Sequence, residues 1–159
     1  MYVCMVTIMQ KLNLPEITAR TRLGLNGKSE IFDEIRRKFV RLTPEEWVRQ
    51  HFLHYMIFQL GFPASLIVVE ASLTYNKMKK RFDMVAYSSA GNPLLIVECK
   101  APDVKLSQSV FDQVAMYNMT LKVGYLAITN GMAHYACRID HENRSYCFLP
   151  ELPKFQDLQ

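Results

Sequence analysis

The chain has 159 residues, of which 50% are hydrophobic and 21% charged, and its formal net charge is +4. This length suits one domain with its own core, and the composition excludes a disordered chain. No apolar run reaches the roughly 18 residues of a membrane span, so we expect no membrane segment. The modest positive charge permits an acidic partner such as nucleic acid but does not require one.

Four cysteines are present, at Cys4, Cys99, Cys137 and Cys147. They form no CxxC pair and their spacing fits no zinc pattern, which favours buried thiols in a reducing cytoplasm. Residues 1–8 are apolar but lack the basic start and cleavage site of a signal peptide. Met9 is an alternative initiator.

Residues 1–41 read as an N-terminal extension of short strands around turns. Within it, Asn26-Gly27 predicts a type I′ hairpin turn. The segment "GLNGKS" ends like a phosphate-binding loop, but that motif needs a glycine five residues before Gly27, where this chain has Arg22. The basic run Arg36-Arg37-Lys38 is interpreted as a solvated face.

The segment "LTPEEWVRQHFLHYMIFQLG" predicts a helix. Thr43 is suited to the N-cap and Pro44 to the first helical position, while Glu46 completes a capping box. Gly61 is expected to end the helix. The helix opens a core that we place at 42–150, followed by a tail at 151–159, with the whole chain forming a single domain.

Hydrophobic periodicity predicts the remaining elements of this core. Strands are expected at 66–74, 80–88, 93–100, 123–130, 133–139 and 145–149, and a second helix at 106–121. A helix, three strands, a helix and further strands favour an α/β protein of the α+β type, with helices packed on a mixed sheet.

The turn "SSAGNP" joins two of these strands as an antiparallel hairpin. A turn centred between Ala90 and Gly91 pairs Asp83 with Glu98, although a shift of one residue would offset them. Opposed carboxylates about 5 Å apart repel each other, but both can reach one small divalent cation. Glu98 and Lys100 share a face because side chains alternate along a strand.

The three charges therefore predict a divalent-metal site with an ammonium beside it. The alternative is a surface salt bridge between Lys100 and either Glu98 or Asp83, which would contribute little. The charged residues alone leave both interpretations open.

The pattern Asp83 … Glu98-Cys99-Lys100 resembles the PD-(D/E)xK nuclease superfamily, with Phe82 in place of the proline. The segments "LTPEEWVRQ", "KRFDMVAY", "LLIVECKAPDV", "FDQVAMYN" and "AITNG" resemble, in that order, the N-terminal nuclease domain of type I restriction enzyme R subunits. The resemblance runs from about residue 30 to 152. It implies a restriction-endonuclease-like αβββαβ core.

The resemblance also implies roles for individual residues. Asp83 and Glu98 would bind Mg²⁺, for which Mn²⁺ can substitute, and Lys100 would orient or activate the attacking water. Gln113 and Tyr117 match the family's Gln-x-x-x-Tyr feature and share a helix face. Gln113 would position the lysine or a phosphate. Tyr117 would contact DNA or pack in the core.

Many of these nucleases also place a glutamate of the first helix near the metal. Glu46 is the candidate here, but its capping role explains it equally well, and Glu45 and Gln50 compete for the position. Lys79, Lys80 and Arg81 directly precede Asp83, so we expect them to hold the DNA backbone by charge.

The predicted activity is metal-dependent hydrolysis of DNA phosphodiester bonds. The sequence contains no helicase motor, so ATP-driven translocation is not implied, and the chain resembles a free-standing, cytoplasmic, bacterial nuclease domain. Expected partners are DNA and other restriction-modification or helicase subunits. A homodimer would suit double-strand cleavage, but no interface signature is visible. The alternative is a catalytically inactive nuclease-fold domain that binds nucleic acid or a partner protein.

Overall fold

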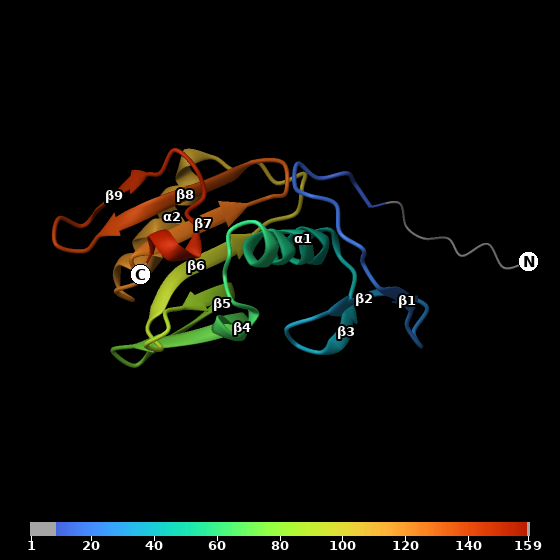
Figure 1. The fold of residues 1–159 in the computed structure, drawn as a ribbon. Coiled ribbons are helices and arrows are strands. Elements are labelled where there is room, and N and C mark those ends of the chain that lie inside the picture. The colour runs from blue at the N-terminus through green and yellow to red at the C-terminus, as the bar shows by residue number, and fades with distance from the viewer. Residues whose placement is uncertain (1–8, 159) are drawn as a thin grey trace, which may run out of the picture.

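The computed structural model describes residues 9–158 and is built around a six-stranded mixed sheet (Figure 1). The strands lie in the order β4-β5-β6-β7-β8-β9, and every neighbouring pair is antiparallel except β6–β7. Their bounds are β4 Ile67–Tyr75, β5 Met78–Tyr87, β6 Pro93–Cys99, β7 Tyr125–Thr129, β8 His134–Asp140 and β9 Ser145–Phe148. The predicted α+β mixed sheet and its element order are confirmed.

The two helices cover opposite faces of this sheet. Helix α1 (Pro44–Phe58) packs Phe52 and Leu53 in one core cluster with Val97 of β6. Helix α2 (Gln108–Met119) packs Phe111 in a second cluster with Ile96, the neighbour of Val97. The continuous apolar run of β6 is therefore explained by burial on both faces. Short 3-10 helices η1 (Ala64–Leu66) and η2 (Phe155–Asp157) complete the core region.

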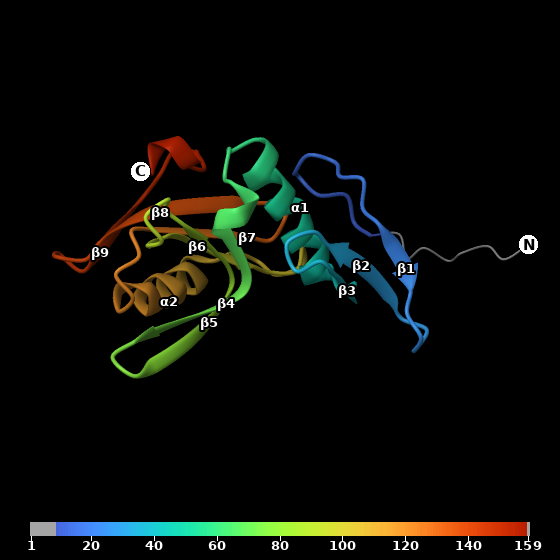
Figure 2. The ribbon, with the colours of Figure 1, turned by 60° about the horizontal axis from the view of Figure 1, so that its bottom comes forward.

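A separate three-stranded sheet lies beside the start of α1 (Figures 1 and 2). It contains β1 (Thr21–Leu23), β2 (Ser29–Asp33) and β3 (Lys38–Arg41). Over residues 9–158, no helix combines the length and the apolar character needed to cross a bilayer.

The first hairpin of this small sheet does not use the predicted type I′ turn. That turn needs a positive φ at both central residues, whereas only Gly27, with φ 72°, adopts one in this loop. The amide of Gly27 donates to the carbonyl of Gly24, and the Asn26 side chain accepts from the amide of Lys28 at 3.1 Å. The side-chain hydrogen bond lets Asn26 remain right-handed, which makes the prediction wrong in turn type.

The second turn corrects the interpretation of the basic run. Buried Asp33 accepts hydrogen bonds from the amides of Ile35 and Arg36, at 2.9 and 2.8 Å, and folds the turn so that Arg36 points inward. The Arg36 side chain is only 12% exposed, whereas that of Arg37 is 76% exposed. A solvated face is therefore right for Arg37 and wrong for Arg36.

Helix α1 begins as its capping residues predict. Pro44 occupies the first turn, and the hydroxyl of Thr43 accepts the amide of Glu46 at 3.0 Å. The second half of the predicted capping box is replaced, because the Glu46 carboxylate binds Arg36 and Gln50 instead, at 2.8 and 2.9 Å. The glutamate is thus drawn into a buried network of charges.

Strands β4 and β5 change faces at one point. Val69 and Met84 pair and belong to the α1 cluster, whereas the next printed pair, Ala71 and Phe82, belongs to the α2 cluster. Residues two positions apart in a regular strand point the same way, but Glu70 adopts a left-handed conformation with φ 53°. The same register sets Glu70 opposite Asp83. Asp83 therefore lies at the point where the side chains of the hairpin switch from one face of the sheet to the other.

Candidate metal centre

Asp83 and Glu98 meet where β5 and β6 separate. The pairs Met84–Val97 and Val85–Ile96 have the register predicted from the turn, and its next step sets Asp83 opposite Glu98. The Asp83 Oδ2 accepts the backbone N–H of Cys99 at 2.7 Å, in place of a further ladder bond. Glu98 is close enough to Asp83 for the charge of Asp83 to raise its pKa.

The environment of this pair favours a cation. Burial raises the pKa of Glu98, and the charge of Asp83 and their hydrogen bond raise it further, to about 8. Lys100 acts in the opposite direction but does not cancel the shift. Glu98 therefore holds a proton near neutral pH, and a bound divalent cation would supply the missing positive charge more strongly than that proton does.

Lys100 follows β6 directly and is held there by its backbone N–H, which donates to the Thr129 carbonyl at 2.8 Å. The charge of its ammonium partly opposes the rise in the pKa values of Glu98 and Glu45. Within the part of the chain that the structure describes, Lys100 forms no ion pair with Glu98 or Asp83. The salt-bridge alternative is therefore not what the geometry shows.

Arg49 is a site residue that the sequence reasoning missed. Its Nη2 donates to Asp83 Oδ1 at 2.7 Å and to Glu45 Oε1 at 3.3 Å, and its Nη1 donates to Glu46. The side chain is 8% exposed. Although burial alone would lower the pKa of Arg49, the charges of Asp83 and Glu46 raise it. The i, i+3 and i, i+4 spacing of Arg49 from two glutamates was the available signal.

The first helix presents two glutamates with different surroundings. Glu46 is buried, and both of its oxygens are engaged by Arg36, Gln50 and Arg49. The Glu45 side chain is 45% exposed, and burial and the charge of Asp83 raise its pKa. Glu45 therefore faces the carboxylate pair, whereas Glu46 is linked to Asp83 through Arg49.

Across residues 9–158, no three His, Cys, Asp or Glu side chains are arranged to hold one metal ion. The candidate donor set is thus the pair Asp83 and Glu98, with the Glu45 carboxylate farther out. Such a set fits Mg²⁺, which usually takes one or two carboxylates and keeps several waters. It does not fit a structural zinc site, which needs a closed shell of protein ligands.

The predicted residues of α2 are less closely tied to the pair. The Gln113 side chain is exposed, and the described structure records no hydrogen bond from it to Glu98 or Lys100. The side chain of Tyr117 lies outside what the structure describes. Their roles remain predictions.

The basic residues of β5 border Glu98. Together with Phe82 and Val114, Lys80 and Arg81 line a cavity of about 220 Å³ into which Glu98 opens. Lys80 Nζ reaches the Thr120 hydroxyl at 3.5 Å, and burial lowers its pKa. Arg81 is exposed and pairs with Glu70 at 2.9 Å. Lys79 is exposed at the neighbouring position. Figure 2 shows this hairpin bending away from the sheet on the side of α2.

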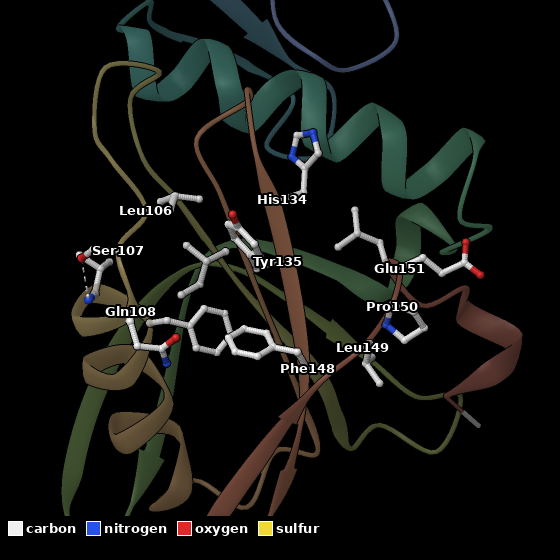
Figure 3. Close-up of a pocket in the computed structure, with 13 residues that line it drawn as sticks. Leu106, Ser107, Gln108, His134, Tyr135, Phe148, Leu149, Pro150 and Glu151 are labelled. Carbon is white, nitrogen blue, oxygen red and sulfur yellow. Dashed lines mark hydrogen bonds between the residues drawn. The ribbon is translucent and has the colours of Figure 1, made fainter.

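A larger cavity of about 460 Å³ lies at the start of α2, between β8 and the chain that follows β9 (Figure 3). Aromatic and aliphatic side chains line most of it, with Tyr135 and Phe148 beside Phe111, and Ser107 and Glu151 are among its polar residues. Its lining includes none of the predicted catalytic residues. The larger of these two cavities and the carboxylate pair are therefore separate features.

The fold and the carboxylate pair at a split strand edge define an α+β domain of the nuclease-like class. The chain belongs to the family described as type I restriction enzyme R protein N terminus, which matches residues 44–153. This confirms the resemblance carried by the five ordered segments. A comparison with curated proteins finds no match.

A solved structure supports the fold. It is a fragment of a protein described as an HsdR subunit of a type I restriction enzyme from Vibrio vulnificus YJ016, with 18% sequence identity and a TM-score of 0.53. The match covers 74% of this chain and 24% of that one. The chain thus spans about a quarter of the Vibrio chain, and the likeness shows the fold.

Proposed function

We propose that the chain hydrolyses DNA phosphodiester bonds with a divalent cation, Mg²⁺ or Mn²⁺, held by Asp83 and Glu98. The observation that supports this most is the pairing of the two carboxylates at the split between β5 and β6, with Lys100 beside them. Like charges placed this close destabilise a fold unless a cation offsets them. Because the chain belongs to a family of restriction enzyme domains, we take DNA as the substrate.

Each side chain has a distinct task in this proposal. A bound cation supplies charge for the phosphate and lowers the pKa of a coordinated water. Arg49 and the Cys99 amide hold the two oxygens of Asp83 in place. Lys100 adds positive charge where a phosphoryl transition state is most negative.

The neighbouring groups would hold the DNA. Lys79 and Arg81 present exposed positive charge along β5, and Arg81 lines the cavity that contains Glu98. Such contacts to phosphates position a duplex without reading its sequence. Within a bacterial restriction-modification assembly in the cytoplasm, other subunits would supply sequence recognition and translocation.

The alternative is a domain that binds DNA or a partner without cutting it. The complete set of Asp83, Glu98 and Lys100 favours catalysis, because a domain that had lost its activity would have no need to keep two buried acids whose proximity raises the pKa of Glu98.

The test is cleavage of linear, nicked, branched and single-stranded DNA by the purified chain with Mg²⁺, Mn²⁺ or EDTA. We expect metal-dependent cleavage that Asp83→Asn and Lys100→Met each reduce by about 10²–10³-fold. Both variants should retain DNA binding in a gel-shift assay. Binding to DNA without cleavage of any of these forms would support the non-catalytic alternative.

A further inference from the structure

Arg36 joins three parts of the chain through one side chain. Its Nε contacts Asp33 Oδ2 at 2.6 Å, its Nη2 contacts Glu46 Oε1 at 2.8 Å, and its Nη1 contacts Glu70 Oε2 at 3.2 Å. Asp33 ends β2, Glu46 lies in the first turn of α1, and Glu70 lies in β4. Each nitrogen of the guanidinium thus serves a different carboxylate on a different element.

Two short routes lead from Arg36 to Asp83. In the first, Glu46 binds Arg49 as well as Arg36, and Arg49 holds Asp83 Oδ1 at 2.7 Å. In the second, Glu70 is the left-handed residue set opposite Asp83 across the β4–β5 pair. Both routes converge on the aspartate that the proposed function needs most.

We propose that Arg36 is a positioning residue of the metal centre and that the small N-terminal sheet is a working part of the site. This inference rests on the proposed function. Arg36 itself touches neither the cation nor the DNA, and it lies outside the family match at 44–153. It acts by fixing Glu46 and Glu70, which in turn fix Arg49 and the β4 backbone around Asp83.

The physical reason is the narrow geometry that Mg²⁺ accepts. The ion requires oxygen ligands at about 2.0–2.1 Å in a nearly ideal octahedron. Partners behind the ligands commonly change metal affinity by about 10–100-fold when they are altered. A lysine cannot replace Arg36, because an ammonium on a flexible stem does not reproduce three nitrogens in one rigid plane.

The chain offers a matched control for this inference. Arg37 is the next residue, has the same charge and length, and among residues 9–158 forms only an exposed pair with Glu34 at 3.4 Å. The substitutions Arg36→Lys and Arg37→Lys therefore change the same chemical group in a buried and in an exposed setting.

The experiment measures Mn²⁺ binding to the full chain by isothermal titration calorimetry, with folding checked by circular dichroism. We expect Arg36→Lys to weaken Mn²⁺ binding by about tenfold and Arg37→Lys to leave it unchanged. In cleavage assays Arg36→Lys should lower kcat and leave the KM for DNA near that of the unaltered chain, because none of the basic residues of β5 is substituted.

A milder variant covers the case in which Arg36→Lys fails to fold. Glu70→Gln keeps the shape of a partly exposed side chain but removes its charge, and we expect a several-fold loss of Mn²⁺ affinity with an intact fold. Wild-type Mn²⁺ binding in a folded Arg36→Lys or Glu70→Gln variant would overturn the inference. If the unaltered chain binds no Mn²⁺, the proposed function fails first.

Discussion

The cavity at the start of α2 and the cavity beside Glu98 differ in both volume and chemical character. The larger one is lined mainly by aromatic and aliphatic side chains such as Phe111, Tyr135 and Phe148, and it contains none of the paired acids. The smaller one has about half the volume, yet Glu98 opens into it beside two basic residues. The smaller cavity holds an acid whose pKa is strongly shifted. A shifted pKa is a better indicator of a functional site than the volume of a cavity.

The largest expected difference between the cavities is in cleavage. Glu98→Ala removes a carboxylate of the metal centre, and we expect at least a 10²-fold loss of cleavage. Tyr135→Ala enlarges the aromatic cavity, and the rate should stay within about threefold of the unaltered chain. Initial rates on one DNA substrate provide the measurement. Equal losses in both variants would show that the aromatic cavity takes part in the reaction.

The aromatic cavity should dominate stability instead. The Phe111 ring is buried and packs on the Phe148 ring at a centroid distance of 4.6 Å. Phe111→Ala is expected to cost about 3–5 kcal/mol of unfolding free energy, whereas Phe148→Ala should cost less because its ring is half exposed. Urea denaturation measures both. A larger loss for Phe148→Ala would reverse this assignment of the core.

The acid in the charged cavity is expected to make stability depend on pH. The pKa of Glu98 is raised from an ordinary value of 4.5 to about 8 in the folded chain. Between these values the folded state keeps a proton that the unfolded state has lost, so this group makes stability fall as pH rises. The glutamine in Glu98→Gln is neutral at every pH, so the variant should not lose this stability as the pH rises.

Thermal melts in EDTA test this prediction. The difference in melting temperature between Glu98→Gln and the unaltered chain should be near zero below pH 4.5. It should increase in favour of Glu98→Gln toward pH 8. Each kcal/mol relieved corresponds to roughly 2–4 °C for a chain of this size. A difference that is constant across the pH range would contradict the raised pKa of Glu98.

Local patterns were enough to predict most of the fold. The N-cap at Thr43 and the register of the β5–β6 hairpin depend on neighbouring residues or on one short turn, and the structure agrees with both. The turn at Asn26-Gly27 was wrong in type, since a side-chain hydrogen bond to the Lys28 amide accompanies a right-handed Asn26.

The site was less predictable, because its charges come from distant segments. The pattern of a strand followed by Glu98 and Lys100 is visible in one stretch of sequence, whereas the contact between Arg49 and Asp83 spans 34 positions. The choice between Glu45 and Glu46 was also beyond the sequence. Adjacent residues of a helix differ by about 100° in direction, and only the packing of α1 decides which one faces the pair.

By itself, the sequence determined the order of the elements and the placement of two acids on neighbouring strands. These features follow from periodicity and turn chemistry, which act over a few residues. The tertiary structure alone decided that Arg36 is buried, that Arg49 holds Asp83 and that the N-terminal sheet reaches the site. An ion pair depends on where two segments meet in space, and no local pattern encodes that distance.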